Sequence, residues 1–392
     1  MSRSDGGHLD YYKEFGISPV RYDLSDLGAH FDRRSSLYNQ LGLPEIAFRG
    51  CRVLEVAPGS GHNSLYLAQS CPTFLDLVEP NPAGIKDILE TYKKYNLQRT
   101  EPVLHKKKLQ EFEPTSLYDV VICENWLGAL PEERQLIKKL ATFVTPGGVM
   151  VMTIVPLSGF MPNILRKLMA NRIISGDMNF EAKTELLVRA FGPHLSTIKG
   201  MTRSHVDWVR DCMINPHYLN VALPLDVVLK DVGAKMELLG SSPSFNTDWR
   251  WFKSLSGDAW KFNENFYSNY VSHSHNFVDY RYLYPARTAT KNEHIDGLCN
   301  QLHDAALKME RHLCEGHSWA QANPSQVLKL VEEIAKELLE ISPHFSDALT
   351  EAGEALAADS LDVTNIANQK YFNALFGRET VYVSFTRRKD PV

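Results

Sequence analysis

The stretch Arg52-Val-Leu-Glu-Val-Ala-Pro-Gly-Ser-Gly-His-Asn-Ser-Leu-Tyr-Leu-Ala68 decides how this chain folds. Its first residues, 53–56, are dense in β-branched and aliphatic side chains, which favours a short strand. The glycines of residues 58–61 predict a tight turn, and Leu65, Tyr66 and Ala68 recur at helical spacing. The stretch therefore predicts a strand, a glycine turn and a helix, in which the glycines allow another group to approach the backbone closely.

Two acidic residues narrow the kind of site that this turn can form. A dinucleotide site expects G-x-G-x-x-G, whereas the spacing here is Ala57-x-Gly59-x-Gly61. Glu55 precedes the turn by two residues, where a carboxylate would repel a pyrophosphate but would suit an ammonium group. A second predicted strand, residues 74–78, ends in Glu79, and an acid at that point suits the two hydroxyls of a ribose.

With these residues in register, the chain resembles the class I (Rossmann-like) S-adenosylmethionine-dependent methyltransferases. The first motif of that superfamily, a hydrophobic strand, an acid and a glycine loop, is matched by residues 54–61, and its ribose acid by Glu79-Pro80-Asn81. The resemblance covers roughly residues 51–157 and two later strands. Ala57 stands where the superfamily has its first glycine, and alanine fits there if its φ angle is negative, as we expect.

The resemblance implies S-adenosylmethionine as the cofactor and suggests how it is bound. Glu55 and the loop around it would hold the methionine half, Glu79 would take the ribose hydroxyls, and Gln110 or Leu109 would border the adenine. The full set of predicted cofactor-binding residues is Glu55, Ala57, Pro58, Gly59, Gly61, Asn63, Glu79, Pro80, Asn81, Gln110, Glu124 and Asn125.

The fold class implied is α/β, with a seven-stranded, mostly parallel Rossmann-like sheet, helices on both faces and a mainly helical insertion or cap domain. The predicted strands are residues 53–56, 74–78, 101–107, 118–123, 149–155, 235–239 and 380–385. Residues 25–41, 83–95 and 131–143 have helical periodicity. In the first of these helices, Leu27, Phe31 and Leu37-Tyr38 form one side and Arg33-Arg34 the other.

Three regions follow from this arrangement. Residues 1–50 are predicted to be an N-terminal helical lid. Residues 51–245 and 379–388 form the cofactor-binding core, with a helical insert at 157–232. Residues 246–378 are an insertion domain that is rich in aromatic residues at first and helical afterwards.

The acceptor end of the site is predicted from position alone, because methyl transfer requires mainly that the protein align the acceptor and exclude water. The candidate acceptor-binding residues are Tyr11, Tyr12, Trp126, Trp208, Asp248 and Trp249. His205 is the first candidate for a general base and His273 the second, with a structural role as the alternative, since the chain has 14 histidines. No metal is predicted, because His273-Ser-His275 lacks a third ligand nearby in the sequence.

Composition limits the partners. A net charge of −5, with Lys106-Lys-Lys108 as its one basic run, gives no footprint for nucleic acid. No apolar stretch is long enough for a membrane span, and the N-terminal residues lack a signal-peptide core. Six cysteines without a C-x-x-C pair fit a reduced, cytoplasmic protein. An oligomer is compatible with the sequence.

The leading hypothesis is therefore a methyltransferase that acts on a small-molecule acceptor enclosed under a helical cap. One alternative is a methyltransferase for a protein or carrier-bound substrate, and another is a non-catalytic protein that binds S-adenosylmethionine. Transfer of another part of the cofactor, such as its aminocarboxypropyl group, is a further alternative.

Overall fold

The computed structural model describes residues 7–18, 21–96 and 99–388, and the chain divides into two compact units. The sheet unit comprises residues 9–155, 220–270 and 380–392, and the helical unit comprises residues 1–8, 156–219 and 271–379. The sequence groups 157–232 with the core, whereas in the structure 156–219 belongs with 271–379. The roles of lid and cap stay predictions, and residues 1–6 and 19–20 of the predicted lid lie outside the described residues.

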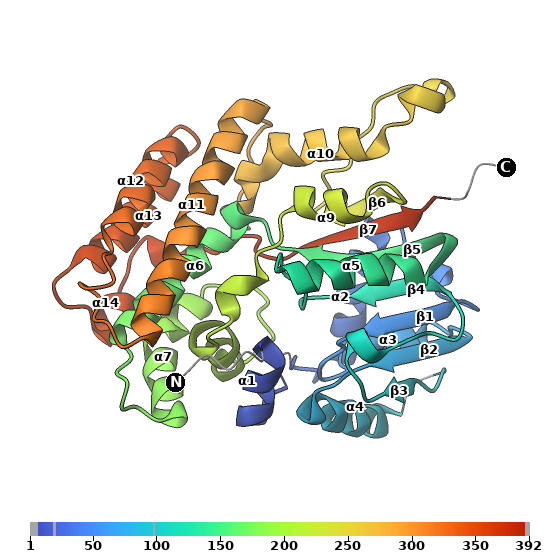
Figure 1. Ribbon diagram of the computed structural model, residues 1–392, viewed down its shortest axis with the longest axis horizontal. Helices are drawn as coiled ribbons and strands as arrows, with labels where there is room; N and C mark the ends of the chain where they lie inside the picture. Colours follow the sequence, from blue (N-terminus) through green and yellow to red (C-terminus); the bar gives the residue numbers. More distant parts are fainter. Residues whose placement is uncertain (1–6, 19–20, 97–98, 389–392) are drawn as a thin grey trace. The chain divides into compact units, whose positions relative to one another are not determined.

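The sheet unit contains the predicted seven-stranded sheet, in the order β3-β2-β1-β4-β5-β7-β6 (Figure 1). Its strands are β1 (Arg52–Val56), β2 (Phe74–Val78), β3 (Val103–His105), β4 (Tyr118–Cys123), β5 (Val144–Ile154), β6 (Met236–Ser242) and β7 (Val381–Arg387). Strands β1 to β5 run parallel to one another, and β7 runs antiparallel to both β5 and β6. The predicted Rossmann-like fold class is confirmed.

Several strand boundaries differ from the prediction, and for β5 and β6 the structure gives the physical reason. Val144 pairs with Tyr118 and Val149 with Val120, so the predicted turn at 145–148 is a bulge within a longer β5. Strand β6 extends to Ser242 and passes Gly240, where a Cβ atom would lie 2.6 Å from the Gln40 carbonyl oxygen. Only glycine fits there, because the end of the helix Leu27–Gln40 packs directly on this strand.

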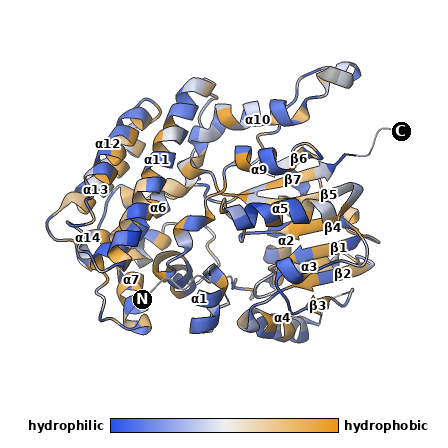
Figure 2. Ribbon diagram, viewed as in Figure 1, coloured by the Kyte–Doolittle hydropathy of each residue, from blue (hydrophilic) through white to orange (hydrophobic). Residues whose placement is uncertain are grey.

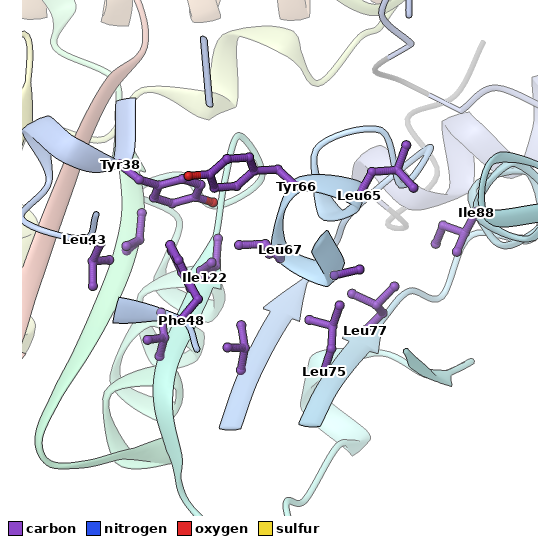
Figure 3. Packing of buried hydrophobic residues seen from close by; sticks show 14 of the residues in the cluster. Tyr38, Leu43, Phe48, Leu65, Tyr66, Leu67, Leu75, Leu77, Ile88 and Ile122 are labelled. Carbon is purple, nitrogen blue, oxygen red and sulfur yellow. The ribbon is translucent and has the colours of Figure 1, made fainter. Parts of the chain in front are cut away.

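Helices cover both faces of the sheet. The helices α2 (Leu27–Gln40), α3 (Ser64–Gln69) and α4 (Pro82–Tyr95) share one buried cluster with strand residues of β1, β2, β4 and β5 (Figure 3). On the other face, α5 (Pro131–Phe143) packs against β4, β5 and α9 (Leu225–Val232). The central strands are hydrophobic in Figure 2, as expected for a sheet buried on both faces. The helices α1 (Gly7–Phe15) and α10 (Phe262–His273) each cross a boundary between the units.

Helix α2 is part of the core of the sheet unit. Tyr38 and Leu41 are completely buried, and the Tyr38 ring stacks on Tyr66 with centroids 5.6 Å apart (Figure 3). Asp26 caps the helix by accepting a hydrogen bond from the Ala29 N–H. Within residues 1–50, the predicted lid function therefore concerns only the segment before α2.

The helical unit is built around α6 (Leu157–Ile173), whose residues 157–170 are all buried. The other helices of this unit are α7 (Phe180–Leu195), α8 (His205–Trp208), α11 (Ala289–Cys314), α12 (Ser325–Leu339), α13 (Pro343–Ala357) and α14 (Val363–Ala367). Arg166 of α6 is buried, and its guanidinium donates to the carbonyl oxygens of Phe372, Asn373 and Leu375. This side chain fastens α6 to the segment that precedes β7.

Within the described ranges, the structure contains neither a membrane-crossing helix nor a cluster of metal ligands. No helix within residues 7–18, 21–96 and 99–388 combines the length and the apolar character that crossing a bilayer requires. In the same ranges, no three or more His, Cys, Asp and Glu side chains are grouped so that they could hold a metal ion.

Candidate active site

The glycine turn between β1 and α3 is held in an unusual backbone conformation. Ala57, Gly59 and Gly61 have positive φ angles of 56°, 58° and 76°. The Ala57 N–H donates to the Val78 carbonyl oxygen at 2.9 Å, which ties the turn to the end of β2. The expectation of a negative φ at Ala57 is therefore wrong, and this alanine carries roughly 1–2 kcal/mol of backbone strain that a glycine would avoid.

Helix α4 approaches the turn closely. A Cβ atom on Gly84 would lie 2.9 Å from the Gly59 carbonyl oxygen, and one on Gly61 would lie 3.0 Å from the Ile88 side chain. The Thr91 hydroxyl donates to the Ser60 carbonyl oxygen at 3.3 Å. The turn is thus supported from one side by a helix, with glycines where the two backbones meet.

Glu79 faces this turn. Its Oε2 accepts a hydrogen bond from the Gly59 N–H at 3.1 Å, and its Oε1 accepts one from the Asn81 N–H at 2.8 Å. The carboxyl is buried, and burial raises its pKa to about 7 against the lowering effect of the two N–H groups. A carboxylate fixed in this way can accept hydrogen bonds from a diol that reaches the turn.

Asn81 has a structural role that the sequence did not indicate. Its Oδ1 caps α4 by accepting from the Ala83 N–H, and its Nδ2 donates to the Ile17 carbonyl oxygen at 2.8 Å. Asn81 is buried and Pro80 is half-buried. This side chain therefore anchors the N-terminal segment and the start of α4.

Glu55 is the second buried acid near the turn. It is 3% exposed, and its Oε2 has no hydrogen-bond partner among the described residues. Burial, followed by the nearby charge of Glu124, raises its pKa to about 8, and the charge of Glu79 adds a smaller effect in the same direction. The carboxyl groups of Glu55 and Glu79 therefore lie in one region beside the turn. A cationic group in that region would stabilise the ionised form of both.

The end of β4 adds a third carboxylate and its partner. Glu124 Oε1 accepts from the Arg34 guanidinium at 2.6 Å and from the Tyr38 hydroxyl at 3.2 Å. The side chains of Arg34 and Glu124 are each only 7% exposed. Next to them, Asn125 has a φ angle of 56°, and its N–H donates to the Thr153 hydroxyl at 2.8 Å. The predicted site residues Glu55, Glu79 and Glu124 therefore come from the carboxyl ends of three neighbouring strands.

Arg34 is the residue that sequence reasoning missed. The periodicity assigned Arg33-Arg34 to the polar side of the helix, but Arg33 is exposed while Arg34 is 6% exposed. The available signal was its spacing of four residues from both His30 and Tyr38, which are also buried.

The two residues predicted to border the adenine lie in different environments. Leu109 is 2% exposed, whereas Gln110 is exposed and its carbonyl oxygen accepts from Lys139 Nζ at 2.9 Å. Asn63 is half-buried at the start of α3 and makes no capping hydrogen bond with its side chain. The side chains of Gln110 and Asn63 are both accessible to a ligand.

The predicted acceptor residues are spread over both units. In the sheet unit, Tyr11 is buried and contacts the rings of Tyr12 and Phe15, and Trp126 is half-buried. Asp248 binds Arg250 on an exposed loop in which Trp249 is 96% exposed.

Three further candidates lie in the helical unit. Trp208 is buried and packs near Phe191, His205 begins α8 beside Gly192, and His273 shares a hydrogen bond with the Ser272 hydroxyl. The packing of Trp208 suits a structural role.

Ligand binding at this site should release protons. Glu55 and Glu79 have ordinary pKa values of 4.5 and folded values of about 8 and 7, so near pH 6.5 both are largely protonated in the ligand-free protein. A ligand that carries an ammonium and a diol favours the ionised carboxylates. Binding should therefore release about one proton or more at pH 6.5 and become tighter as the pH rises to 8.

Calorimetry of binding in two buffers of different ionisation enthalpy gives this proton count. The same raised pKa values predict that the ligand-free protein loses stability between about pH 4.5 and 8, since the folded state binds more protons there than the unfolded chain. A proton count of zero, with an affinity that does not change with pH, would contradict these assignments.

Part of this chain matches a known protein family. Residues 29–183 match the family described as "Methyltransferase domain". A comparison with curated protein sequences gives no match.

Solved structures similar to this chain include the N-methyltransferase NodS from Bradyrhizobium japonicum WM9 in complex with S-adenosyl-L-homocysteine. The identity is 17%, the TM-score is 0.30, and the match covers 36% of this chain and 72% of that one. Another is magnesium protoporphyrin IX methyltransferase from Synechocystis PCC 6803 with bound S-adenosylmethionine, at 17% identity and a TM-score of 0.31, covering 38% of this chain and 74% of that one.

The chain carries a class I S-adenosylmethionine-dependent methyltransferase domain. The residues that match the family model include the glycine turn and all three carboxylates. The protein is an S-adenosylmethionine-dependent methyltransferase, and S-adenosylmethionine is its cofactor.

Proposed function

We propose that this methyltransferase transfers the methyl group to a small-molecule acceptor. The connectivity of the sheet unit carries the proposal. The chain leaves this unit after Val155, at the end of β5, and returns at Thr380, before β7. Ile154 and Val381 are paired residues of these two strands, so both crossings lie at the sheet edge that holds the cofactor turn. A large insertion attached at that edge supports an enclosed site for a modest acceptor.

Charge supports a small acceptor over nucleic acid. The chain has 42 Lys and Arg against 47 Asp and Glu, whereas binding to a phosphate backbone requires an excess of cations. We assign cofactor binding to Glu55, Glu79 and the turn between β1 and α3. Tyr11, Tyr12 and Trp126 are the acceptor-binding candidates in the sheet unit, with Trp208, Asp248 and Trp249 as further candidates, and His205 and His273 are the candidate bases.

The test is to incubate the full-length protein with S-adenosylmethionine labelled in its methyl group and with a cell extract. The mixture is then separated by ultrafiltration into small molecules and macromolecules. We expect enzyme-dependent label in the ultrafiltrate, and none with the Glu79→Ala variant. Label retained on protein or nucleic acid would contradict a small-molecule acceptor.

A further inference from the structure

The Arg34–Glu124 ion pair is geometrically incomplete. Arg34 donates to Glu124 through Nη2 alone, and the Arg34 Nε and Glu124 Oε2 atoms are buried without a hydrogen-bond partner among the described residues. A guanidinium presents Nε and Nη2 along one edge, which matches both oxygens of a carboxylate. In this pair one of the two possible hydrogen bonds is unformed on each side.

Other pairs in the sheet unit show what a complete pair looks like. Arg134 contacts Asp231 with Nε and Nη2, each at 2.7 Å. Arg21 contacts Asp87 through the same edge at 2.7 and 2.9 Å. Both of these arginines are more exposed than Arg34, so the buried pair, where unpaired atoms cost most, is the one left unfinished.

A third unpartnered atom belongs to the same cluster. Glu55 Oε2 is buried without a hydrogen-bond partner in the described part of the chain, and Glu55 interacts electrostatically with both Glu124 and Arg34. Val56 of β1 pairs with Cys123 of β4, which places Glu124 one residue beyond the strand end next to the cofactor turn. The cluster therefore offers one free guanidinium N–H and two free carboxylate oxygens at one place.

These atoms match an α-amino acid group. An ammonium is a donor only, and it suits the free oxygens of Glu55 and Glu124. A carboxylate is an acceptor only, and it suits the Nε–Nη2 edge of Arg34. The methionine part of S-adenosylmethionine carries both groups on a single carbon, whereas the adenosine part carries neither.

We propose that Arg34 is the positioning residue that binds the carboxylate of the cofactor's methionine part, and that Glu124 occupies Arg34 until the cofactor arrives. On binding, the cofactor carboxylate takes both Nε and Nη2, and Glu124 turns to the ammonium together with Glu55. This inference rests on the assignment of the cofactor to the turn between β1 and α3. It adds α2 to the cofactor site, which explains why an arginine is buried in that helix.

The test compares two ligands by calorimetry: S-adenosylhomocysteine and its decarboxylated analogue, in which hydrogen replaces the carboxylate. Wild-type protein should bind S-adenosylhomocysteine about 10- to 100-fold more tightly than the analogue, the effect of one or two hydrogen bonds between charged groups. In Arg34→Met, this preference should disappear because the affinity for S-adenosylhomocysteine falls while that for the analogue stays within about twofold. Arg33→Met, on the exposed side of the same helix, should behave as wild type.

Several outcomes would overturn the inference. Wild-type protein without a preference between the two ligands would do so even if Arg34→Met does not fold. Equal losses for both ligands in Arg34→Met would show that Arg34 supports only the fold. Failure of the wild type to bind either ligand would instead refute the cofactor site itself. In steady-state kinetics, Arg34→Lys should raise KM for S-adenosylmethionine with little change in kcat, because lysine keeps the charge but loses the paired edge.

Discussion

Replacing Glu79 with alanine should lower the affinity for S-adenosylhomocysteine by about 100-fold or more, roughly 3 kcal/mol. Two effects combine in this prediction. The ribose loses a buried carboxylate acceptor, for which each hydrogen bond contributes about 1.5–3 kcal/mol. The turn also loses the acceptor that fixes the Gly59 and Asn81 N–H groups, so the backbone is less well prepared for the ligand.

Calorimetric titration of Glu79→Ala, alongside its melting temperature, measures this effect. Glu90→Ala is a matched control, because Glu90 lies on the exposed side of α4 and its pair with Lys86 is long, at 3.8 Å. The control should bind as tightly as wild type. If folded Glu79→Ala retains wild-type affinity, Glu79 does not contact the ribose.

Replacing Arg166 with methionine should destabilise the helical unit by about 3–5 kcal/mol. The guanidinium is buried, donates to three carbonyl oxygens of residues 372–375 and lies 3.7 Å from the Phe376 ring centroid. Burial lowers the pKa of Arg166 to about 9, so desolvating this charge offsets part of its benefit. The substitution nevertheless removes three hydrogen bonds to backbone carbonyl oxygens. The Phe372 carbonyl keeps the Leu375 N–H as a donor, and each buried acceptor that loses its donor costs about 1–3 kcal/mol.

Hydrogen exchange followed by mass spectrometry can locate this effect. In Arg166→Met, the amides of α6 should exchange faster by the factor that corresponds to the lost free energy, while those of β1 and β4 keep their protection. Arg189→Met, on an exposed position of α7, should leave both regions unchanged. A change in α6 below about 1 kcal/mol would mean that the segment before β7 is held by packing rather than by Arg166.

The sheet could be predicted from the sequence because its strands are short apolar runs placed between turns and helices of clear periodicity. Strands β2 and β4 have the predicted limits, and helix α5 begins and ends at the predicted residues. The ends of β5 and β6 differ because they depend on partners distant in sequence. A bulge opposite β4 lengthens β5. In β6, the backbone at the end of α2 packs beside Gly240, which lies in the part of the strand beyond its predicted end.

The cofactor site was only partly predictable. Glu55 and Glu79 could be identified because a motif fixes their distance from the turn. The positive φ of Ala57 could not, since it depends on how the turn is held between β2 and α4. Arg34 was assigned to the polar side of its helix, because its spacing from His30 and Tyr38 is a weak signal and its partner Glu124 is distant in the sequence.

The grouping of the chain into units was also beyond the sequence. Residues 156–219 pack with 271–379, although about 50 residues of the sheet unit separate them along the chain. Buried contacts such as that between Ser158 and Ser274, or between His303 and the Leu219 carbonyl oxygen, join these segments. Periodicity identifies the helices but not which of them share a core.

The central claim is that Glu55 and Glu79 bind opposite ends of one cofactor. It is tested most directly by measuring how Glu55→Gln and Glu79→Gln bind S-adenosylhomocysteine and 5′-methylthioadenosine, which lacks the amino acid part. We expect Glu79→Gln to lower the affinity for both ligands by the same factor. Glu55→Gln should lower the affinity for S-adenosylhomocysteine alone. Equal effects of Glu55→Gln on both ligands, or no effect of either substitution in folded protein, would contradict it.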